Sequence, residues 1–374
     1  TDGRYAVCML DRNGLRPARY VITKNGYITL ASEIGVWNYA PEDVISKGRV
    51  GPGKLIAVDT QTGTLLDTKA IDDVLKNAQP YKKWLRAEAR RIESDRALEK
   101  QLLGQVSRER LNIYQKMFLV TYEERDQIIR PLAEAGQEAV GSMGDDTPMA
   151  VLSGRVRHLA DYFRQQFAQV TNPPIDPLRE AIVMSLETAF GPELNIFEET
   201  PEHARRAIVS SPVLSHSKFQ QLQSVDLLGF ESEAIDLNYA EDEGLQAAIL
   251  RVCKQAEAAV SAGRSQLVLS DRNIRENYLP INALMATGAI HHYLIKVGLR
   301  CDANLIVETA VARDAHHFAV LLGFGATAIY PYLAYDIIAD MARSGEILGD
   351  PLEAQAYFRK GVDKGLLKIL SKMG

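Results

Sequence analysis

The chain contains 374 residues, of which 46% are hydrophobic and 24% are charged, and it carries a formal net charge of −5 at pH 7. This composition is typical of a globular protein, and the length is sufficient for two or three domains of roughly 100–200 residues each. The negative charge gives no basic footprint for nucleic acid, the first residues show no signal-peptide pattern, and no apolar run approaches the roughly 20 residues that span a bilayer.

Residues 1–67 are predicted to be β-rich. Short β-prone runs occupy 5–10, 20–23, 27–31 and 55–59. Turn signals separate these runs, and the Asn25-Gly26 pair between two aromatic-led runs favours a β-hairpin. A sheet this small has open edges, so we expect it to complete a larger sheet.

Charged, Ala- and Leu-rich sequence follows and predicts helices. We expect helices at 71–85 and 84–103, with a break at Pro80, and two amphipathic helices within 109–136. The stretch 86–110 is dense in Arg and Glu, which predicts an exposed linker helix.

The middle of the chain alternates loops rich in Gly and Pro with short elements. A Gly/Asp loop lies at 141–147, and three prolines make 171–177 irregular. The other expected elements are a strand at 149–152 and helices at 158–169 and 178–189.

The last third of the chain alternates apolar strands with helices. Strands are predicted at 266–270, 303–308 and 326–330, and helices at 282–297, 316–322, 334–343 and 352–372. Continuous apolar strands in this order predict a parallel sheet covered by helices, with right-handed crossovers. A (β/α) barrel or part of one is the first interpretation, and an open doubly wound sheet is the second.

The cysteines and histidines follow no disulfide or metal pattern. The three cysteines stand singly, at Cys8, Cys253 and Cys301, which fits a reducing cytoplasm. The histidines form no HExxH motif, and the His316-His317 pair opens an apolar helical run, so we predict no metal site. Thr1 could act as an N-terminal nucleophile, but it leads directly into a predicted strand and we assign it no catalytic role.

Four phrases of the sequence are long and unusual. They are LDRNGLRP at 10–17, EAVGSMGDDTP at 138–148, DYFRQQFAQVTNPPIDP at 161–177 and RCDANLIVETA at 300–310. Through them the chain resembles the large (alpha) subunit of glutamate synthase over essentially its whole length.

The resemblance implies an α/β fold in three parts. Residues 1–80 would be a β-rich remnant, the C-terminal part of a class II glutamine amidotransferase domain of the N-terminal-nucleophile type. Residues 81–135 would be a helical connector, and 136–374 the glutamate synthase central domain. That domain would contain parallel β/α units, as a partial or degenerate (β/α) barrel related to the flavin domain.

The resemblance also implies a function for the parent enzyme, which converts glutamine, 2-oxoglutarate and reductant to two glutamates in the cytoplasm. This segment would link the amidotransferase and flavin domains and help enclose the ammonia passage, with no catalytic residue and no cofactor of its own. FMN, an iron–sulfur cluster and the N-terminal cysteine nucleophile would belong to the rest of the subunit. The expected partners are those remaining domains and a small subunit that supplies electrons, from NADPH rather than ferredoxin, and we expect neither nucleic acid nor membrane as a partner.

Two groups of residues are predicted to lie near sites. Asp11, Arg12 and Arg16 could bind a carboxylate or amide, because Arg offers forked recognition, or they could form a turn closed by an Asp–Arg pair. The resemblance implies that these three are structural residues near the amidotransferase site. It also implies that Thr171 and Asn172, in a loop stiffened by prolines, line the ammonia passage, with a buried structural turn as the alternative.

Other polar segments leave alternatives open. The loop at 141–147 is either a structural junction or the lining of a site, and its two aspartates would repel phosphate. The run SDRN at 270–273, Glu308 and Arg313-Asp314 follow predicted strands, where sites form in β/α folds. The resemblance implies instead that Glu308 and Arg313 are paired structural charges. The competing function is a stand-alone α/β enzyme with a site at these strand ends.

Overall fold

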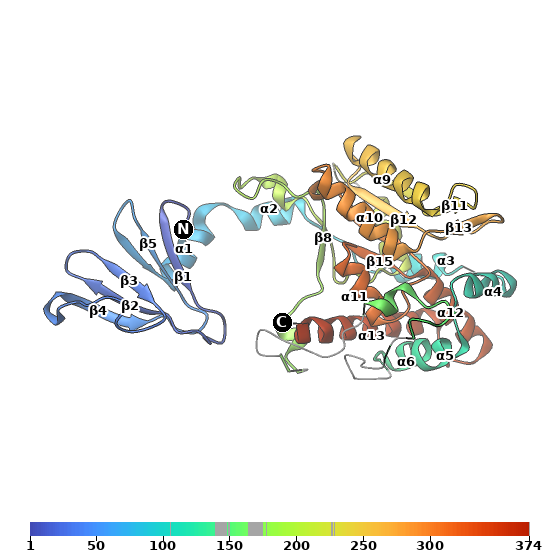
Figure 1. Cartoon of the computed structure of the whole chain (residues 1–374), viewed down its shortest axis with the longest axis horizontal. Helices are drawn as coiled ribbons and strands as arrows, with labels where there is room; N and C mark the ends of the chain where they lie inside the picture. The colour runs from blue at the N-terminus through green and yellow to red at the C-terminus, as the bar shows by residue number, and fades with distance from the viewer. Residues whose placement is uncertain are drawn as a thin grey trace. The chain divides into compact units, whose positions relative to one another are not determined.

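The structure, a computed structural model, describes residues 1–104, 106–138, 148, 150–163, 175–176, 178–225, 227 and 229–373. The chain folds into two compact units, Thr1–Ala87 and Glu88–Gly374 (Figure 1). The architecture is α/β, as predicted, with a β-rich first unit and parallel β/α units in the second. The boundaries expected at residues 80 and 135 stay predictions.

The first unit contains two small antiparallel sheets. One has the order β1 (Tyr5–Met9), β5 (Leu55–Asp59) and β6 (Thr64–Asp67), and the other the order β3 (Ile28–Ala31), β2 (Arg19–Thr23) and β4 (Val44–Arg49). The predicted hairpin is confirmed, because β2 pairs with β3 and Gly26 turns between them with a φ of +76°. The strands β4 and β6 were not predicted.

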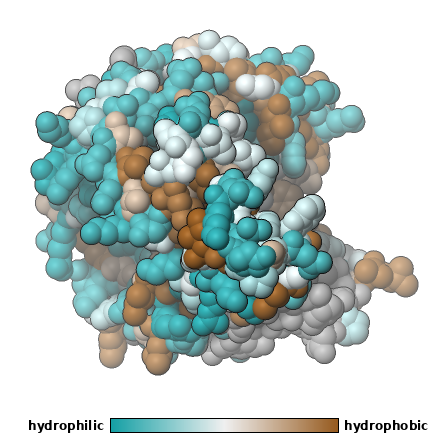
Figure 2. All heavy atoms as spheres, turned by 90° about the vertical axis from the view of Figure 1, so that its left-hand side faces the viewer, coloured by the Kyte–Doolittle hydropathy of each residue, from teal (hydrophilic) through white to brown (hydrophobic). Residues whose placement is uncertain are grey.

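The first unit has a small core and many exposed apolar side chains. Four buried residues form its core cluster, namely Leu10, Ala18, Val50 and Ile56. Figure 2, which faces this unit, shows brown apolar side chains among teal hydrophilic ones. Ile34 and Trp37 are among the exposed ones, at 81% and 69%. The helix η1 (Pro41–Asp43) and the helices α1 (Thr68–Ala78) and α2 (Tyr81–Glu88) complete this part of the chain.

The predicted helix at 84–103 is wrong. The helix α2 ends at Glu88, the short strand β7 (Arg90–Arg91) follows, and α3 (Arg96–Leu102) starts anew with Asp95 as its N-cap. The strand β7 pairs in parallel with β9 (Ala207–Val209), which lies far along the chain. This tertiary pairing overrides a local helix propensity of a few tenths of a kcal/mol per residue, and an exposed linker helix across 86–110 is therefore also wrong.

The two helices expected within 109–136 are confirmed. The first is α4 (Arg108–Met117). The second is a continuous helical segment made of α5 (Tyr122–Glu124), the π-helical η2 (Arg125–Ile129) and α6 (Arg130–Ala135).

Three predictions in the middle of the chain need correction or lie outside the description. Ala150 to Leu152 form a turn and not a strand, and Leu152 is 98% exposed. Of the helix expected at 158–169, the structure describes only the 3-10 helix η3 (Leu159–Tyr162), because 164–174 lie outside the described residues. The helix expected at 178–189 is short, since α7 (Glu180–Val183) gives way to strand β8 (Thr188–Phe190), which pairs with β9.

The second unit is built on a four-stranded parallel sheet. Its order is β10 (Ser232–Asp236), β12 (Gln266–Ser270), β14 (Asn304–Glu308) and β15 (Ala328–Tyr330). Val213 adds an isolated parallel bridge to Ile329 beyond β15. Neighbours in space are also neighbours in sequence, as in a (β/α) barrel, whereas a doubly wound sheet reverses its order at a switch point. The parallel β/α prediction is confirmed, and the order favours its barrel-like form.

Helices surround this sheet, and all four of those predicted in the last third are confirmed. They are α8 (His216–Gln223), α9 (Leu245–Ser261), α10 (Ala283–Lys296), α11 (Ala315–Gly323), α12 (Tyr332–Ser344) and α13 (Pro351–Met373). The helices α8 and α9 were not predicted. The remaining elements are η4 (Pro201–Ala204), η5 (Arg300–Asp302) and the antiparallel pair β11 (Asn238–Ala240) and β13 (Tyr278–Pro280).

Helix α13 packs against α6, α11 and α12 (Figure 1). Two glycines on α13 allow this packing. A Cβ at Gly361 would lie 2.6 Å from Cδ2 of Leu132 and 3.0 Å from the backbone N of Gln137, and one at Gly365 would overlap Cβ of Ala315. Side chains at these two positions would therefore push α6 and α11 away from α13.

The end of α4 stores backbone strain at Leu119. The backbone N–H of Leu119 donates to the carbonyl of Lys116, and that of Val120 donates to Gln115, which is the Schellman arrangement. Its left-handed position normally takes glycine, yet Leu119 adopts a φ of +56° and is 51% exposed. The Cβ of an L-residue in this conformation costs roughly 1–2 kcal/mol.

We therefore expect Leu119→Gly to be more stable than Leu119→Ala by about 1 kcal/mol. Both variants lose the same exposed side chain, but only glycine removes the strained Cβ. Urea unfolding of the two variants, followed by circular dichroism, measures this difference. Equal midpoints would show that the φ of +56° carries no strain.

Candidate functional site

The predicted residues Asp11, Arg12 and Arg16 lie in the loop between β1 and β2. The carboxylate of Asp11 accepts hydrogen bonds from the backbone N–H groups of Asn13 (2.9 Å) and Leu15 (3.1 Å). Arg12 and Arg16 are exposed, and the ion pairs of the described chain include neither. A turn closed by an Asp–Arg pair is therefore wrong, because Asp11 closes the turn on backbone groups. A role for the three residues near an amidotransferase site stays a prediction.

Thr171 and Asn172, and the loop at 141–147, lie outside the described residues. The segments that flank 164–174 are described, however, and both are attached to helices. On the N-terminal side, His316 Nε2 on α11 lies 2.9 Å from the carbonyl oxygen of Ala160. The ring of Phe163 also packs edge-on against Phe324 at the end of α11.

On the other side of this segment, Lys372 on α13 donates to the carbonyl of Ile175 (3.4 Å). Ser371, also on α13, donates to the carboxylate of Glu180 in α7 (2.8 Å). The two ends of the predicted passage loop are thus attached to α11 and α13, which pack against each other.

The carboxyl edge of the parallel sheet gathers polar side chains, as β/α folds generally do. Arg272 pairs with Glu308 at 3.0 Å, and the Ser270 hydroxyl donates to the other oxygen of Glu308 (2.7 Å). The guanidinium of Arg272 also lies over the ring of Tyr332, 5.1 Å from its centre. These groups bond to one another, so the edge contains a closed network.

Asp271 is fully buried beside this network. Its carboxylate accepts hydrogen bonds from the Thr309 hydroxyl (2.5 Å) and from the backbone N–H of Ala310 (3.1 Å). Burial nevertheless outweighs these bonds and raises the pKa of Asp271 to about 7.

Glu308 and Arg313 are each paired, as predicted, but not with each other. Glu308 binds Arg272, whereas Arg313 donates from Nε to Glu124 at 2.6 Å and from Nη1 to the carbonyl of Ala310 at 2.8 Å. Only 2% of the Arg313 side chain and 14% of the Glu124 side chain are exposed. The sequence carries no signal for the second pair, because its members are 189 residues apart.

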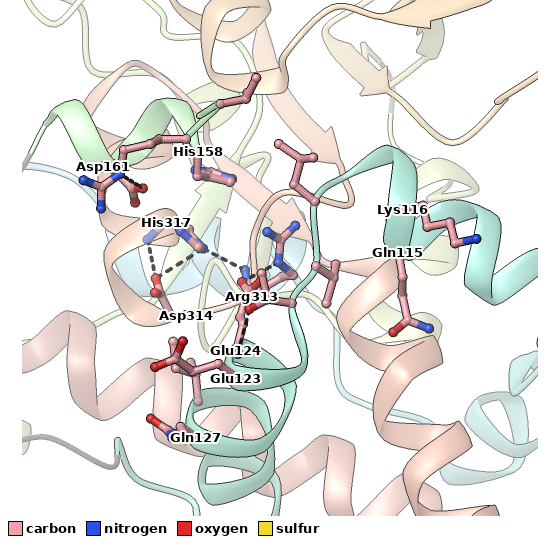
Figure 3. Close-up of a pocket in the computed structure, with 16 residues that line it drawn as sticks. Gln115, Lys116, Glu123, Glu124, Gln127, His158, Asp161, Arg313, Asp314 and His317 are labelled. Atoms are coloured by element: carbon pink, nitrogen blue, oxygen red, sulfur yellow. Dashed lines mark hydrogen bonds and ion pairs between the residues drawn. The ribbon is translucent and has the colours of Figure 1, made fainter. Parts of the chain in front are cut away.

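A pocket of about 680 Å³ opens above this buried pair (Figure 3). Its walls come from the end of α4 with the start of α5, from residues 156–161, and from the loop between β14 and α11. Twelve of its 16 lining residues are polar or charged, including Lys116, Glu123, Gln127, Asp161 and Asp314. The pocket size is that of small-molecule sites, but those sites are usually more apolar.

One wall of the pocket brings together His158, Asp161 and His317. One potential ligand atom from each lies within 4.8 Å of the others. Burial lowers the pKa of both histidines, and Arg313 lowers both further, so the rings are neutral at pH 7 and their nitrogens could bind a metal.

The ring geometry opposes a shared metal ion at this wall. The His158 and His317 rings stack with their centres 4.2 Å apart and their planes at 27°. Imidazole lone pairs lie in the ring plane, so stacked rings do not direct them to one point. In addition, Asp161 pairs with Arg157 (3.5 Å), and a backbone N–H donates to Nδ1 of each histidine. The absence of a metal site stays a prediction, and the trio acts as a packing contact between η3 and α11.

The described helices include none that is both long and apolar enough to cross a membrane.

Comparisons with known proteins match both parts of the chain. The family model described as glutamate synthase central domain matches residues 113–374, and the model described as class-II glutamine amidotransferases matches residues 1–84. The chain is 39% identical to the glutamate synthase [NADPH] large chain of Bacillus subtilis (strain 168) and 42% identical to that of Azospirillum brasilense. It is 41% identical to the chloroplastic ferredoxin-dependent glutamate synthase of Oryza sativa subsp. japonica. Each match includes 100% of this chain but only 24%, 25% and 24% of the respective relative, so the chain spans about a quarter of the length of these relatives.

We expect Arg313→Met to lower the free energy of unfolding by about 3–5 kcal/mol, because the Glu124 carboxylate is left buried without its cation. The double variant Arg313→Met, Glu124→Leu should lose less than the single variant, since no buried charge remains. Denaturant unfolding of the wild type and both variants measures the difference. The exposed pair Arg91–Glu187 is the control, and Arg91→Met should lower the stability far less than Arg313→Met does. A double variant that is less stable than Arg313→Met would contradict this account.

Asp271 predicts a pH-dependent stability. Its pKa is about 7 in the folded chain against 3.8 when exposed, so between about pH 4 and 7 the folded form keeps a proton that the unfolded form loses. This group therefore lowers the stability as the pH rises through that window, by up to about 4 kcal/mol, with no further change above about 7. Asp271→Asn lacks the titration, so its melting temperature relative to the wild type should increase from pH 4.5 to 7. A constant difference across this range would show that Asp271 titrates normally.

Proposed function

The chain belongs to the glutamate synthase family, and on this premise we propose that it is the segment of a glutamate synthase large subunit that joins the amidotransferase domain to the flavin domain. The parent enzyme would transfer the amide nitrogen of glutamine to 2-oxoglutarate and reduce the product, giving two glutamates. The observation that carries this proposal is the match of amidotransferase and central-domain models, in that order, along one chain. The segment itself would hold the two sites in a fixed relation and perform neither chemical step.

We propose NADPH, delivered through a small subunit, as the source of electrons. The names of the Bacillus and Azospirillum relatives support NADPH, although the rice relative is named as ferredoxin-dependent. Assays of the parent enzyme with each reductant in turn would decide between them. The three free cysteines support a cytoplasmic location.

FMN and an iron–sulfur cluster would be carried by other parts of the parent subunit. A cluster needs several cysteine ligands close together. Here Cys8 lies in β1, Cys253 in α9 and Cys301 in η5, and the part of the chain that the structure describes contains no cysteine among its grouped metal-ligand side chains. These residues do not fit the cluster, and we assign it to none of them.

The segment would also help to enclose the path of ammonia between the two sites, with Thr171 and Asn172 in its lining. A passage excludes water only if its walls keep their positions, and the attachments on either side of 164–174 support this role. Ala160 and Phe163 are held by residues at the two ends of α11, and Ile175 is held by Lys372 on α13.

Asn172→Trp in the parent enzyme should uncouple glutamine hydrolysis from glutamate formation, because the indole would obstruct the passage while both active sites remain intact. The measurement is the ratio of glutamine consumed to 2-oxoglutarate consumed, which should rise above that of the wild type.

Leu178→Trp is the matched control, since Leu178 is 88% exposed and close in sequence to the same loop. The control should keep the wild-type ratio. If Asn172→Trp also keeps that ratio, Asn172 does not line the passage.

A further inference from the structure

A rigid turn at residues 195–198 carries two exposed apolar side chains, and we call it the docking turn. The Asn195 side chain accepts a hydrogen bond from the N–H of Phe197 (3.1 Å) and donates one to the carboxylate of Glu198 (2.9 Å). The N–H of Glu198 donates to the carbonyl of Asn195 (3.0 Å), which also lies 3.0 Å from Nε2 of His203. These bonds fix the conformation of the turn before any partner binds.

The base of the docking turn is attached to the body of the second unit. The N–H of Glu193 donates to the carbonyl of Cys301 in η5 (2.7 Å). Arg206 reaches back from beyond η4 and donates to the carbonyl of Pro192 (2.7 Å). The turn is therefore held on both sides.

Ile196 and Phe197, at the tip of the docking turn, are 80% and 89% exposed. Single exposed apolar residues are common on protein surfaces. Here two adjacent large apolar side chains lie on a turn whose backbone is held by the hydrogen bonds described above. Rigid apolar anchors of this kind are typical of binding hot spots, since little conformational freedom is lost when they dock.

The surroundings of the tip define the chemistry of its partner. The segment 192–202, PELNIFEETPE, contains four glutamates and no lysine or arginine. Glu198 and Glu202 flank the tip on its C-terminal side, and a hydrogen bond from Thr200 lowers the pKa of Glu202. A complementary surface would offer an apolar pocket with lysine or arginine at its rim.

We propose that the docking turn inserts Ile196 and Phe197 into an apolar, basic-rimmed pocket on a domain of the parent subunit that lies outside residues 1–374. This inference rests on the proposed function, in which the chain is one segment of a longer polypeptide. We place the pocket on another domain because the relatives match this chain throughout and are about four times as long as it is. Most of the surface available to the turn in such a protein therefore belongs to other domains of the same subunit.

The test places the photo-crosslinking amino acid p-benzoylphenylalanine at position 197 of the full-length parent subunit. This residue has nearly the shape of phenylalanine at its base, so the turn keeps its structure. We expect a crosslink within one subunit to a segment beyond residues 1–374 that contains apolar and basic residues. A crosslink to another part of residues 1–374, a crosslink to a second subunit, or no crosslink would each overturn the proposal.

A second measurement separates docking from folding. The double variant Ile196→Ser, Phe197→Ser should leave the melting temperature of the 374-residue chain unchanged, because both side chains are exposed there. In the full-length subunit it should make limited proteolysis between domains about tenfold faster, the change that corresponds to a loss of about 1.4 kcal/mol of docking. The control is Tyr122→Ser, at a side chain that is 78% exposed elsewhere on the same unit, and it should leave the proteolysis rate unchanged. Equal rates for the double variant and the control would overturn the proposal.

The outcome does not depend on whether the proposed reaction is right. Glutamate formation from glutamine and 2-oxoglutarate is assayed first on the unmodified parent enzyme, and its absence would refute the proposed function alone. The crosslink map and the proteolysis rates report only on the docking turn.

Discussion

The close approach of α13 to its neighbours is the constraint on which most of the second unit depends. At Gly361 and Gly365 the backbone of α13 comes so near to α6 and α11 that a single Cβ would not fit. This contact joins two parts of the chain that are far apart in sequence, the helices before residue 138 and the β/α units after residue 232. The same helix then uses its C-terminal end to bind Glu138, Ile175 and Glu180. Helix α13 thus sets the spacing between itself, α6 and α11. It also binds the chain at Glu138 and again at Ile175 and Glu180.

Two charged side chains that the second unit buries are each paired with an opposite charge. A buried cation or carboxylate without a partner costs several kcal/mol, and the second unit buries charged groups at the carboxyl edge of its sheet and beside the pocket described above. The buried Glu308 carboxylate pairs with Arg272, whose side chain is 41% exposed, and the buried Arg313 guanidinium pairs with Glu124. In an enzyme of the β/α type, some of these edge groups would be left to bind substrate. Among the described residues, Arg272, Glu308 and Ser270 bind one another, and Asp271 binds Thr309.

The sequence predicted the sheet better than it predicted the contacts. The strands β12, β14 and β15 are apolar throughout and lie between helices, so burial on both faces made their type and order readable. The strand β10, with the sequence SEAID at the edge of the sheet, carries too much charge for the same reasoning. The helix expected at 84–103 failed because Arg90 and Arg91 pair with a strand more than a hundred residues later, and no local pattern encodes that pairing. The partners of Arg313, Asp11 and His158 were hidden for the same reason, because each is set by the tertiary fold or by backbone groups.

The proposed role of the chain, which is to hold two active sites in a fixed relation, requires a rigid second unit. Reactions in sequence at two separate sites gain from an intermediate that passes between them without entering water, and this requires the connecting structure to keep its shape. Rigidity of this kind comes from close packing, and α11 and α13 are packed closely at Gly365. These helices also position the segments bonded to them, because His316 on α11 contacts the carbonyl of Ala160 and Lys372 on α13 donates to the carbonyl of Ile175.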